Sequence, residues 1–158
     1  MKTYASIIVL GLSLLFFSCK STDSVTKAEQ KALITQKIEG MNYKFVPRTA
    51  NPSRGNSINL NYSYYLKVNK DTVSAYLPYF GRAYSAPPYG GDGGINILST
   101  DFEYTIKEKK TGEWDISINI KDDQKRYELN LSAGDTGYGS LSVRDNNRSP
   151  ISFYGSIE

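Results

Sequence analysis

Four side chains between residues 76 and 95 are the best suited in this chain to contact a ligand: Tyr79, Arg82, Tyr84 and Tyr89. A tyrosine ring offers a flat stacking surface with a hydroxyl at its edge, and a guanidinium pairs with acidic groups or stacks on rings. Together these residue types are typical of a glycan- or peptide-binding surface. They also suit a structural role, and for Arg82 we favour a stack on a neighbouring ring.

The composition excludes much of the usual chemistry of hydrolases. The chain contains no histidine, so Ser-His-Asp and Cys-His nucleophiles and histidine-containing zinc sites are excluded. The acidic residues between Asp101 and Glu128 fall on polar strand faces or in turns, which makes a paired-carboxylate enzyme the least favoured function. Residues 91–93 and 122–123 offer too few oxygen ligands for calcium. We therefore expect a protein that is not an enzyme and that needs no metal and no cofactor.

Residues 1–18 are typical of a lipoprotein signal peptide. Lys2 supplies a positive charge, and residues 7–17 form an apolar run too short to span a bilayer. The only cysteine, Cys19, follows at once, in a stretch that resembles the lipobox of bacterial lipoproteins in the relaxed form found in Bacteroidota. We expect Cys19 to carry the lipid and to anchor the protein in the cell envelope, with the outer membrane as the expected membrane. The alternative is a plain secretory signal followed by an incidental cysteine.

The rest of the chain is expected to form one domain. A polar tether over residues 19–25 precedes a single β domain over residues 26–158, and 39% of the 158 residues are apolar, enough for one core. The formal charge is +3, and removal of residues 1–18 takes away only Lys2 and leaves +2. This charge is too small to indicate a nucleic-acid partner. The expected partners are a membrane, through the N-terminal lipid, and a glycan or protein ligand.

One short helix is predicted near the start of the domain. Thr26 and Glu29 match a capping box, and Gly40 is a plausible stop. Its apolar side chains form a modest stripe that can lie on a sheet: Leu33, Ile34 and Ile38, with Met41 beyond the end.

From Tyr43 onward the apolar residues alternate, which predicts strands. Residues 58–69 and 114–120 have the strictest alternation and are each predicted to form one strand. About eight or nine strands separated by turns predict an antiparallel meander that forms a sandwich or a barrel-like sheet. The expected core brings together two sets of residues: Trp114, Ile116, Ile118 and Ile120 from one strand, and Ile58, Leu60, Tyr62 and Leu66 from the other.

The aromatic stretch between these strands is expected to be an ordered loop. Its prolines and glycines prevent a long regular element, while its aromatic residues argue against disorder. We predict that Phe80 belongs to the core and that Tyr79, Arg82 and Tyr89 stay partly accessible. Arg148, in the last turn, is expected at the surface.

Several short motifs resemble those of domain-of-unknown-function family 4251, which is found in Bacteroidota envelope lipoproteins. They are Leu77–Tyr84, Pro88–Gly90, Gly93–Ile95 and Asn147–Arg148, with Ile151, Tyr154 and Gly155. The resemblance covers most of the chain after Cys19. It implies a shared domain and an envelope location, and it carries over no activity and no catalytic residue.

Three functions stay open at this point. The first is a non-catalytic envelope lipoprotein whose aromatic loop covers the core or contacts a partner. The second is a glycan- or peptide-binding module that uses the loop from Tyr79 to Tyr89. The third, an enzyme, is the least favoured. Rings buried against the sheet favour the first function, and a groove of exposed rings beside Arg82 favours the second.

Overall fold

The structure is a computed structural model, and it describes residues 22–82, 93–121 and 126–158. The chain divides into two compact units, Met1–Gln30 and Lys31–Glu158, with the boundary inside helix α2 (Thr22–Glu39). No helix among the described residues is long and apolar enough to cross a membrane.

Ten strands are found in the described residues, all of them in the second unit. They are β1 (Tyr43–Pro52), β2 (Ile58–Asn59), β3 (Tyr65–Asn69), β4 (Thr72–Leu77), β5 (Ile95–Ser99), β6 (Phe102–Lys110), β7 (Glu113–Lys121), β8 (Arg126–Gly134), β9 (Tyr138–Asp145) and β10 (Arg148–Ile157). The prediction of a mainly β fold with one short helix is confirmed.

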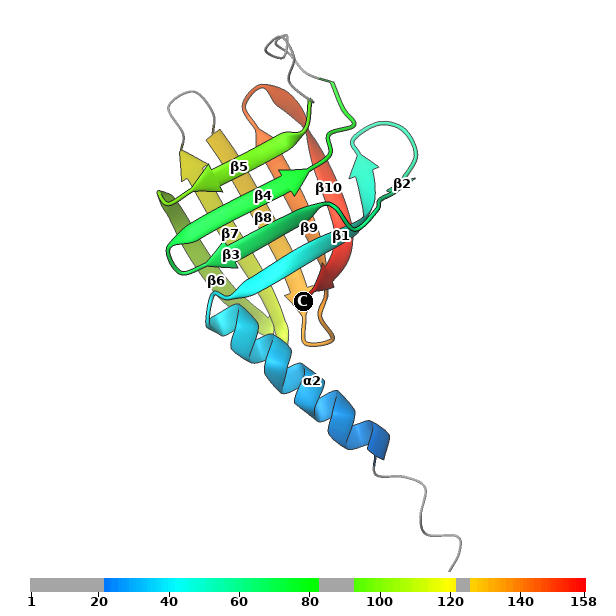
Figure 1. The fold of residues 1–158 in the computed structure, drawn as a ribbon, viewed down its shortest axis with the longest axis vertical. Coiled ribbons are helices and arrows are strands. Elements are labelled where there is room, and N and C mark those ends of the chain that lie inside the picture. Colours follow the sequence, from blue (N-terminus) through cyan, green and yellow to red (C-terminus); the bar gives the residue numbers. More distant parts are fainter. Residues whose placement is uncertain (1–21, 83–92, 122–125) are drawn as a thin grey trace, which may run out of the picture. The chain divides into compact units, whose positions relative to one another are not determined.

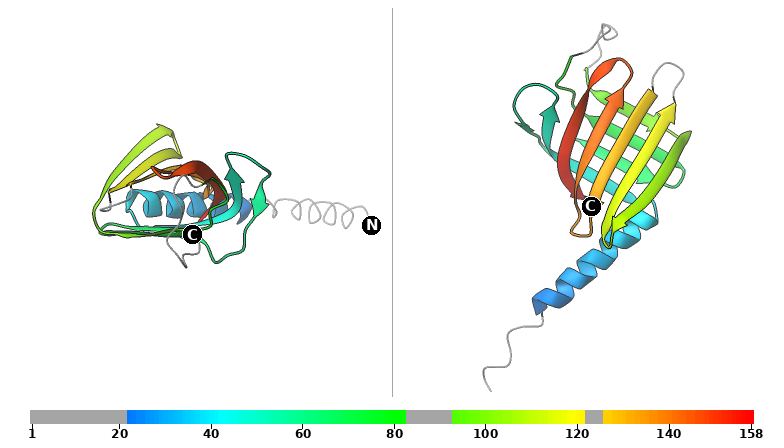
Figure 2. Two further views of the ribbon diagram at one scale, coloured as in Figure 1. Left: turned by 90° about the horizontal axis from the view of Figure 1, so that it is seen from above. Right: turned by 180° about the vertical axis from the view of Figure 1, so that it is seen from behind.

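The strands form one antiparallel sheet in the order β5-β4-β3-β1-β10-β9-β8-β7-β6, with β2 paired to β1. Most neighbours in sequence are neighbours in the sheet, as in a meander, with two exceptions. β2 and β3 both pair with β1 and not with each other, and β5 and β6 lie at opposite ends of the order, while β1 pairs with β10 instead. The sheet curls into a half-barrel, so that β1 and β3–β5 face β6–β9 across the core (Figures 1 and 2). The predicted antiparallel sheet with a barrel-like curl is confirmed.

The inward faces of the two halves supply the core. On β7 the predicted alternation is confirmed, because Trp114, Ile116, Ile118 and Ile120 are all buried. Leu66 on β3 is also fully buried, which confirms its predicted place.

The predicted single strand over residues 58–69 is wrong. Only the two residues of β2 and the five of β3 are in strands, Leu60 is partly buried, and the Tyr62 side chain is 72% exposed. The cause lies in the partner strand β1, which contains Pro47, a residue with no N–H to donate, and whose pairing with β10 shifts register between Pro47 and Thr49. On its other edge β1 pairs with β3 up to Phe45 and with β2 only from Thr49. The chain opposite this bulge therefore leaves the sheet, and Tyr62 lies on the surface under the Arg48 guanidinium, 4.0 Å from the ring centroid.

Helix α2 begins at Thr22, one turn before the predicted start at Thr26, and it ends at Glu39. The predicted end at Gly40 is confirmed, since Glu39 is the last helical residue, although the residue with left-handed backbone is Met41, with φ 49°, and not Gly40. The apolar stripe is narrower than predicted. Ile34 and Ile38 are buried, whereas Leu33 is 56% exposed.

Candidate functional site

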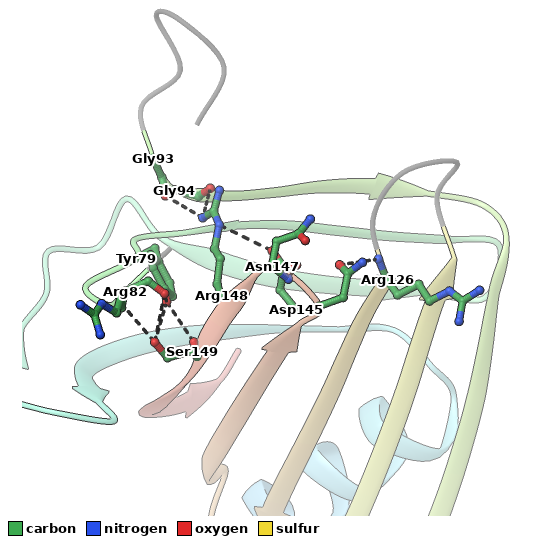
Figure 3. Close-up of polar contacts among 10 residues, drawn as sticks. Tyr79, Arg82, Gly93, Gly94, Arg126, Asp145, Asn147, Arg148 and Ser149 are labelled. Atoms are coloured by element: carbon green, nitrogen blue, oxygen red, sulfur yellow. Dashed lines mark hydrogen bonds and ion pairs between the residues drawn. The ribbon is translucent and has the colours of Figure 1, made fainter. Parts of the chain in front are cut away.

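The described ends of the aromatic stretch converge on the turn between β9 and β10 (Figure 3). Tyr79–Arg82 follows β4, Gly93–Gly94 precedes β5, and the turn itself brings in Asp145 and Arg148–Ser149. We call this set of interacting residues the clamp: Tyr79, Arg82, Gly93, Gly94, Asp145, Arg148 and Ser149. It joins segments that are more than fifty residues apart in sequence.

Tyr79 and Ser149 fix the backbone of Arg82. The Tyr79 hydroxyl lies 2.9 Å from the Arg82 carbonyl oxygen and 3.0 Å from that of Ser149, so it can donate to either one. The Ser149 N–H and hydroxyl both donate to the Arg82 carbonyl oxygen, at 3.1 and 3.0 Å, and the Arg82 N–H donates back to the Ser149 hydroxyl oxygen at 3.2 Å. The Tyr79 ring also packs against the core. Hydrogen bonds to both the N–H and the carbonyl oxygen of Arg82 therefore fix its backbone.

Arg148 occupies the centre of the clamp. Its guanidinium donates to the carbonyl oxygens of Gly93 at 2.7 Å and Gly94 at 3.1 Å, and it lies 5.0 Å from the centroid of the Tyr79 ring. Its Nε is 3.6 Å from the Asp145 carboxylate, and the two side chains are only 13% and 4% exposed. The prediction that Arg148 has a surface role is wrong, because its partners come from a part of the chain far away in sequence.

The stack that we favoured for Arg82 is not formed with any ring of the described residues; Tyr84 and Tyr89 lie outside them. Among the described residues its side chain has no ring contact and no ion pair, and Figure 3 shows it pointing away from the clamp. Arg148 makes the stack instead.

Of the two adjacent aromatic residues, Phe80 was expected in the core and is instead 38% exposed. Tyr79 is half-buried, which agrees with the expectation that it stays partly accessible, but its hydroxyl is used in the clamp. Tyr84, Tyr89 and Cys19 lie outside the described residues.

A groove of about 430 Å³ lies beside the clamp. Three segments line it, each with two residues: Ser53 and Arg54 after β1, Gly81 and Arg82 after β4, and Ser149 and Pro150 at the start of β10. Of these described lining residues, two are arginines and none is acidic. Such a groove can bind an acidic group.

Among the described residues, the two tyrosines with shifted pKa values lie away from the clamp. Burial raises the pKa of Tyr43 well above its ordinary value, and the neighbouring charge of ionised Tyr104 raises it further. Burial also raises the pKa of Tyr104, against a lowering by its hydrogen bond to Tyr43. Their hydroxyl oxygens are 3.5 Å apart and join β1 to β6. Both hydroxyls are therefore neutral at physiological pH, as expected for structural groups.

In the part of the chain that the structure describes, neither a metal-binding cluster nor a surface ion pair provides a second candidate site. Among the described residues, no three His, Cys, Asp or Glu side chains are placed to share a metal ion. Asp115, whose pKa is lowered by its hydrogen bond to Lys109, is part of an exposed ion pair with an N–O distance of 2.6 Å.

Sequence reasoning identified two residues of this region, Tyr79 and Arg82, and missed the others. The motif Asn147–Arg148 could have pointed to these residues, because it is part of the family resemblance, but the sequence alone does not place it beside the aromatic stretch. Arg54 had no such signal, since it lies in a stretch of ordinary loop residues.

A family model described as a domain of unknown function, DUF4251, matches residues 26–157. Among solved structures, the crystal structure of a DUF4251 family protein from Bacteroides eggerthii is similar, with a TM-score of 0.58 and 12% sequence identity. The match covers 84% of this chain and 89% of that chain. At this identity the likeness concerns the fold alone. A search of curated proteins finds no match.

Proposed function

Since the chain belongs to the DUF4251 family, whose shared domain has no assigned activity, we propose that it is a non-catalytic lipoprotein of the cell envelope. A lipid on Cys19 anchors it, with the outer membrane as the expected membrane, and residues 26–158 form the displayed β domain. The observation that carries the non-catalytic part is the clamp, in which the most distinctive polar side chains of the motifs contact one another.

The clamp supports this proposal because its groups are already satisfied. A general acid, a base or a nucleophile must reach a substrate, but the Asp145 carboxylate is only 4% exposed and accepts the Asn147 N–H at 2.8 Å. The Arg148 guanidinium is shared between two carbonyl oxygens and a ring. These motif residues stabilise the loop ends, and the loop can then contact a partner.

The anchor is tested with Cys19→Ala, expressed in cells that carry the lipoprotein pathway. The parent chain should incorporate a fatty-acid label and sediment with membranes, and the variant should do neither. One acyl chain gives only marginal binding, so more than one chain is expected on the parent. Ser18→Ala, which keeps the cysteine, is the matched control and should behave like the parent. Membrane sedimentation and detergent partitioning of Cys19→Ala equal to those of the parent would contradict the proposal.

A second candidate function, the glycan- or peptide-binding module, is favoured by one observation. The Arg82 backbone is fixed while its guanidinium is exposed on the groove, which is the arrangement expected of a preorganised binding residue. Tyr79 leaves the candidate binding set, because the clamp uses its hydroxyl and one face of its ring. In a test by saturation-transfer NMR on the full chain in detergent, Arg82→Ala should lose contacts to glycan or peptide fragments without a change in melting temperature.

A further inference from the structure

We propose that the groove beside the clamp binds the acidic group of a sugar-sized ligand between the guanidinium groups of Arg54 and Arg82. This inference rests on the binding role proposed for Arg82 and deepens it, because it names the chemistry of the ligand and adds Arg54 as a second binding residue.

The first argument is the charge of the groove. Arg54 and Arg82 are both exposed and line the same groove, and none of the other described residues that line it is acidic. Three of the other four arginines have acidic partners: Arg48 with Glu158, Arg144 with Glu128, and Arg148 with Asp145. Within the described chain, neither guanidinium of the groove has such a partner. Two uncompensated like charges on one groove favour an anion from solution.

A comparison with Arg126 shows how the charge of this groove differs from that of another surface hollow. Arg126 also has no ion pair among the described residues, but the hollow that it lines contains Glu103, Glu128 and Asp145. These carboxylates balance the three cations of that hollow, Lys121, Arg126 and Arg144. The described lining of the groove of Arg54 and Arg82 differs because its positive charges are not balanced.

The second argument is the support of the two arginines. Ser149 and Tyr79 hold the Arg82 backbone by hydrogen bonds. The Ser53 hydroxyl donates to the carbonyl oxygen of Pro150, the residue that follows Ser149. Both arginine segments are thus tied to the same two residues at the start of β10. Fixed backbones reduce the conformational entropy that binding removes.

The third argument is the fit of chemistry and size. A guanidinium donates two parallel N–H groups to the two oxygens of a carboxylate, sulfate or phosphate. The volume of about 430 Å³ lies in the lower range of small-molecule sites, which begins at roughly 300 Å³. A single sugar unit that carries such a group satisfies both conditions.

The test measures binding to the full chain in detergent micelles by isothermal titration calorimetry. The probes are galacturonate, galactose 6-sulfate and galactose 6-phosphate, with neutral galactose as the matched control ligand. At least one acidic probe should bind, neutral galactose should not, and the affinity should fall as the salt concentration rises. The strongest of the three acidic probes identifies the acidic group.

Arg54→Gln and Arg82→Gln should each weaken binding by about tenfold or more, which is typical of a lost hydrogen bond to a charged group. Arg126→Gln is the matched control and should bind like the parent. Equal melting temperatures of the three variants would show that weaker binding is not caused by a loss of folding.

Two results would overturn the inference, and they differ in what they say of the proposed function. Arg82-dependent binding of neutral galactose, unaffected by Arg54→Gln, would keep the binding module and reject the acidic ligand. Failure of every probe, or equal losses in Arg54→Gln, Arg82→Gln and Arg126→Gln, would reject the acidic-sugar site, and absence of Arg82-dependent contacts in the saturation-transfer experiment would reject the binding module as well.

Discussion

At the scale of single residues, the two arginines of the aromatic region have opposite roles. Arg148 is nearly buried and holds the two loop ends together, and Arg82 is held by its backbone and presents its side chain to the groove. The distinction depends on contacts between residues far apart in sequence. Local residue types therefore could not assign these roles.

Arg148→Ala should lower the free energy of unfolding by about 3 kcal/mol, because it removes the ion pair of a nearly buried carboxylate and the hydrogen bonds that the guanidinium donates to two carbonyl oxygens. Arg144→Ala is the control, since that side chain is 62% exposed and its ion pair with Glu128 measures 3.9 Å. Its loss should be below about 1 kcal/mol. Urea denaturation measures both, and equal losses would contradict the central place of Arg148.

Tyr79→Phe removes only the hydroxyl that contacts the carbonyl oxygens of Arg82 and Ser149. We expect a loss of about 1–2 kcal/mol in the free energy of unfolding, as for a lost hydrogen bond in a partly buried place. Tyr154→Phe, at an exposed ring that stacks on Tyr138, should change it very little. A loss for Tyr154→Phe as large as that for Tyr79→Phe would show that the clamp hydroxyl adds nothing.

Tyr43 gives a prediction for high pH. Its pKa is raised in the folded protein by burial, above the ordinary value of 10.0, so the unfolded chain loses its proton first. The folded state then binds more protons than the unfolded state, and stability falls as the pH rises above about 10. Tyr43→Phe should reduce this fall, measured by denaturation from about pH 8 to pH 11. The fall should be unchanged in Tyr62→Phe, whose ring is exposed.

At the scale of elements, the success or failure of strand prediction depended on the partner strands. Strict alternation identified β7 correctly, because both neighbours of β7 pair with it over nearly its whole length. The same alternation over residues 58–69 predicted a single strand wrongly. Alternation shows which side chains of a segment share a face, but it does not show whether the partner strand has the geometry to pair with that segment. Pro47 was visible in the sequence, but its position opposite residues 60–64 was not.

Gly155 is required where β10 passes the bulge in β1. A Cβ at this residue would overlap the Val46 carbonyl oxygen and lie 2.7 Å from the Pro47 Cα. Gly155→Ala should therefore cost about 2 kcal/mol or more in the free energy of unfolding, because backbone atoms must move. Gly134→Ala is the control, since its nearest neighbour would be 3.7 Å away. Circular dichroism melts should separate the two variants, and equal melting temperatures would contradict the close approach.

At the scale of the whole molecule, the antiparallel sheet and its alternating core were predictable from the sequence, because each strand carries its own pattern. The order of the strands was not, since the pairing of β1 with β10 leaves no local trace. The clamp depends on that same order: it needs the β9–β10 turn beside the ends of β4 and β5. This is why Tyr79 and Arg82 were identified as unusual residues but their partners were not.

Ile118→Ala tests the shared core. The side chain is fully buried on β7, and truncation of such an isoleucine costs about 2–5 kcal/mol, a large share of the stability of a domain. Ile106→Ala on the neighbouring strand β6 is the control, because that side chain is 37% exposed. Denaturant midpoints should fall strongly for the first variant and slightly for the second. An unchanged midpoint for Ile118→Ala would mean that the core does not depend on this face of β7.

The pairing of β1 with β10 also sets a late step in folding. Phe45 pairs with Ile157, so the sheet becomes continuous only when two strands far apart in sequence meet. Contacts of such high contact order form slowly. Until β10 joins the sheet, β1 has an unprotected edge, and the clamp has neither Arg148 nor Ser149 to close it. Closure of the sheet and assembly of the clamp are therefore expected to occur together.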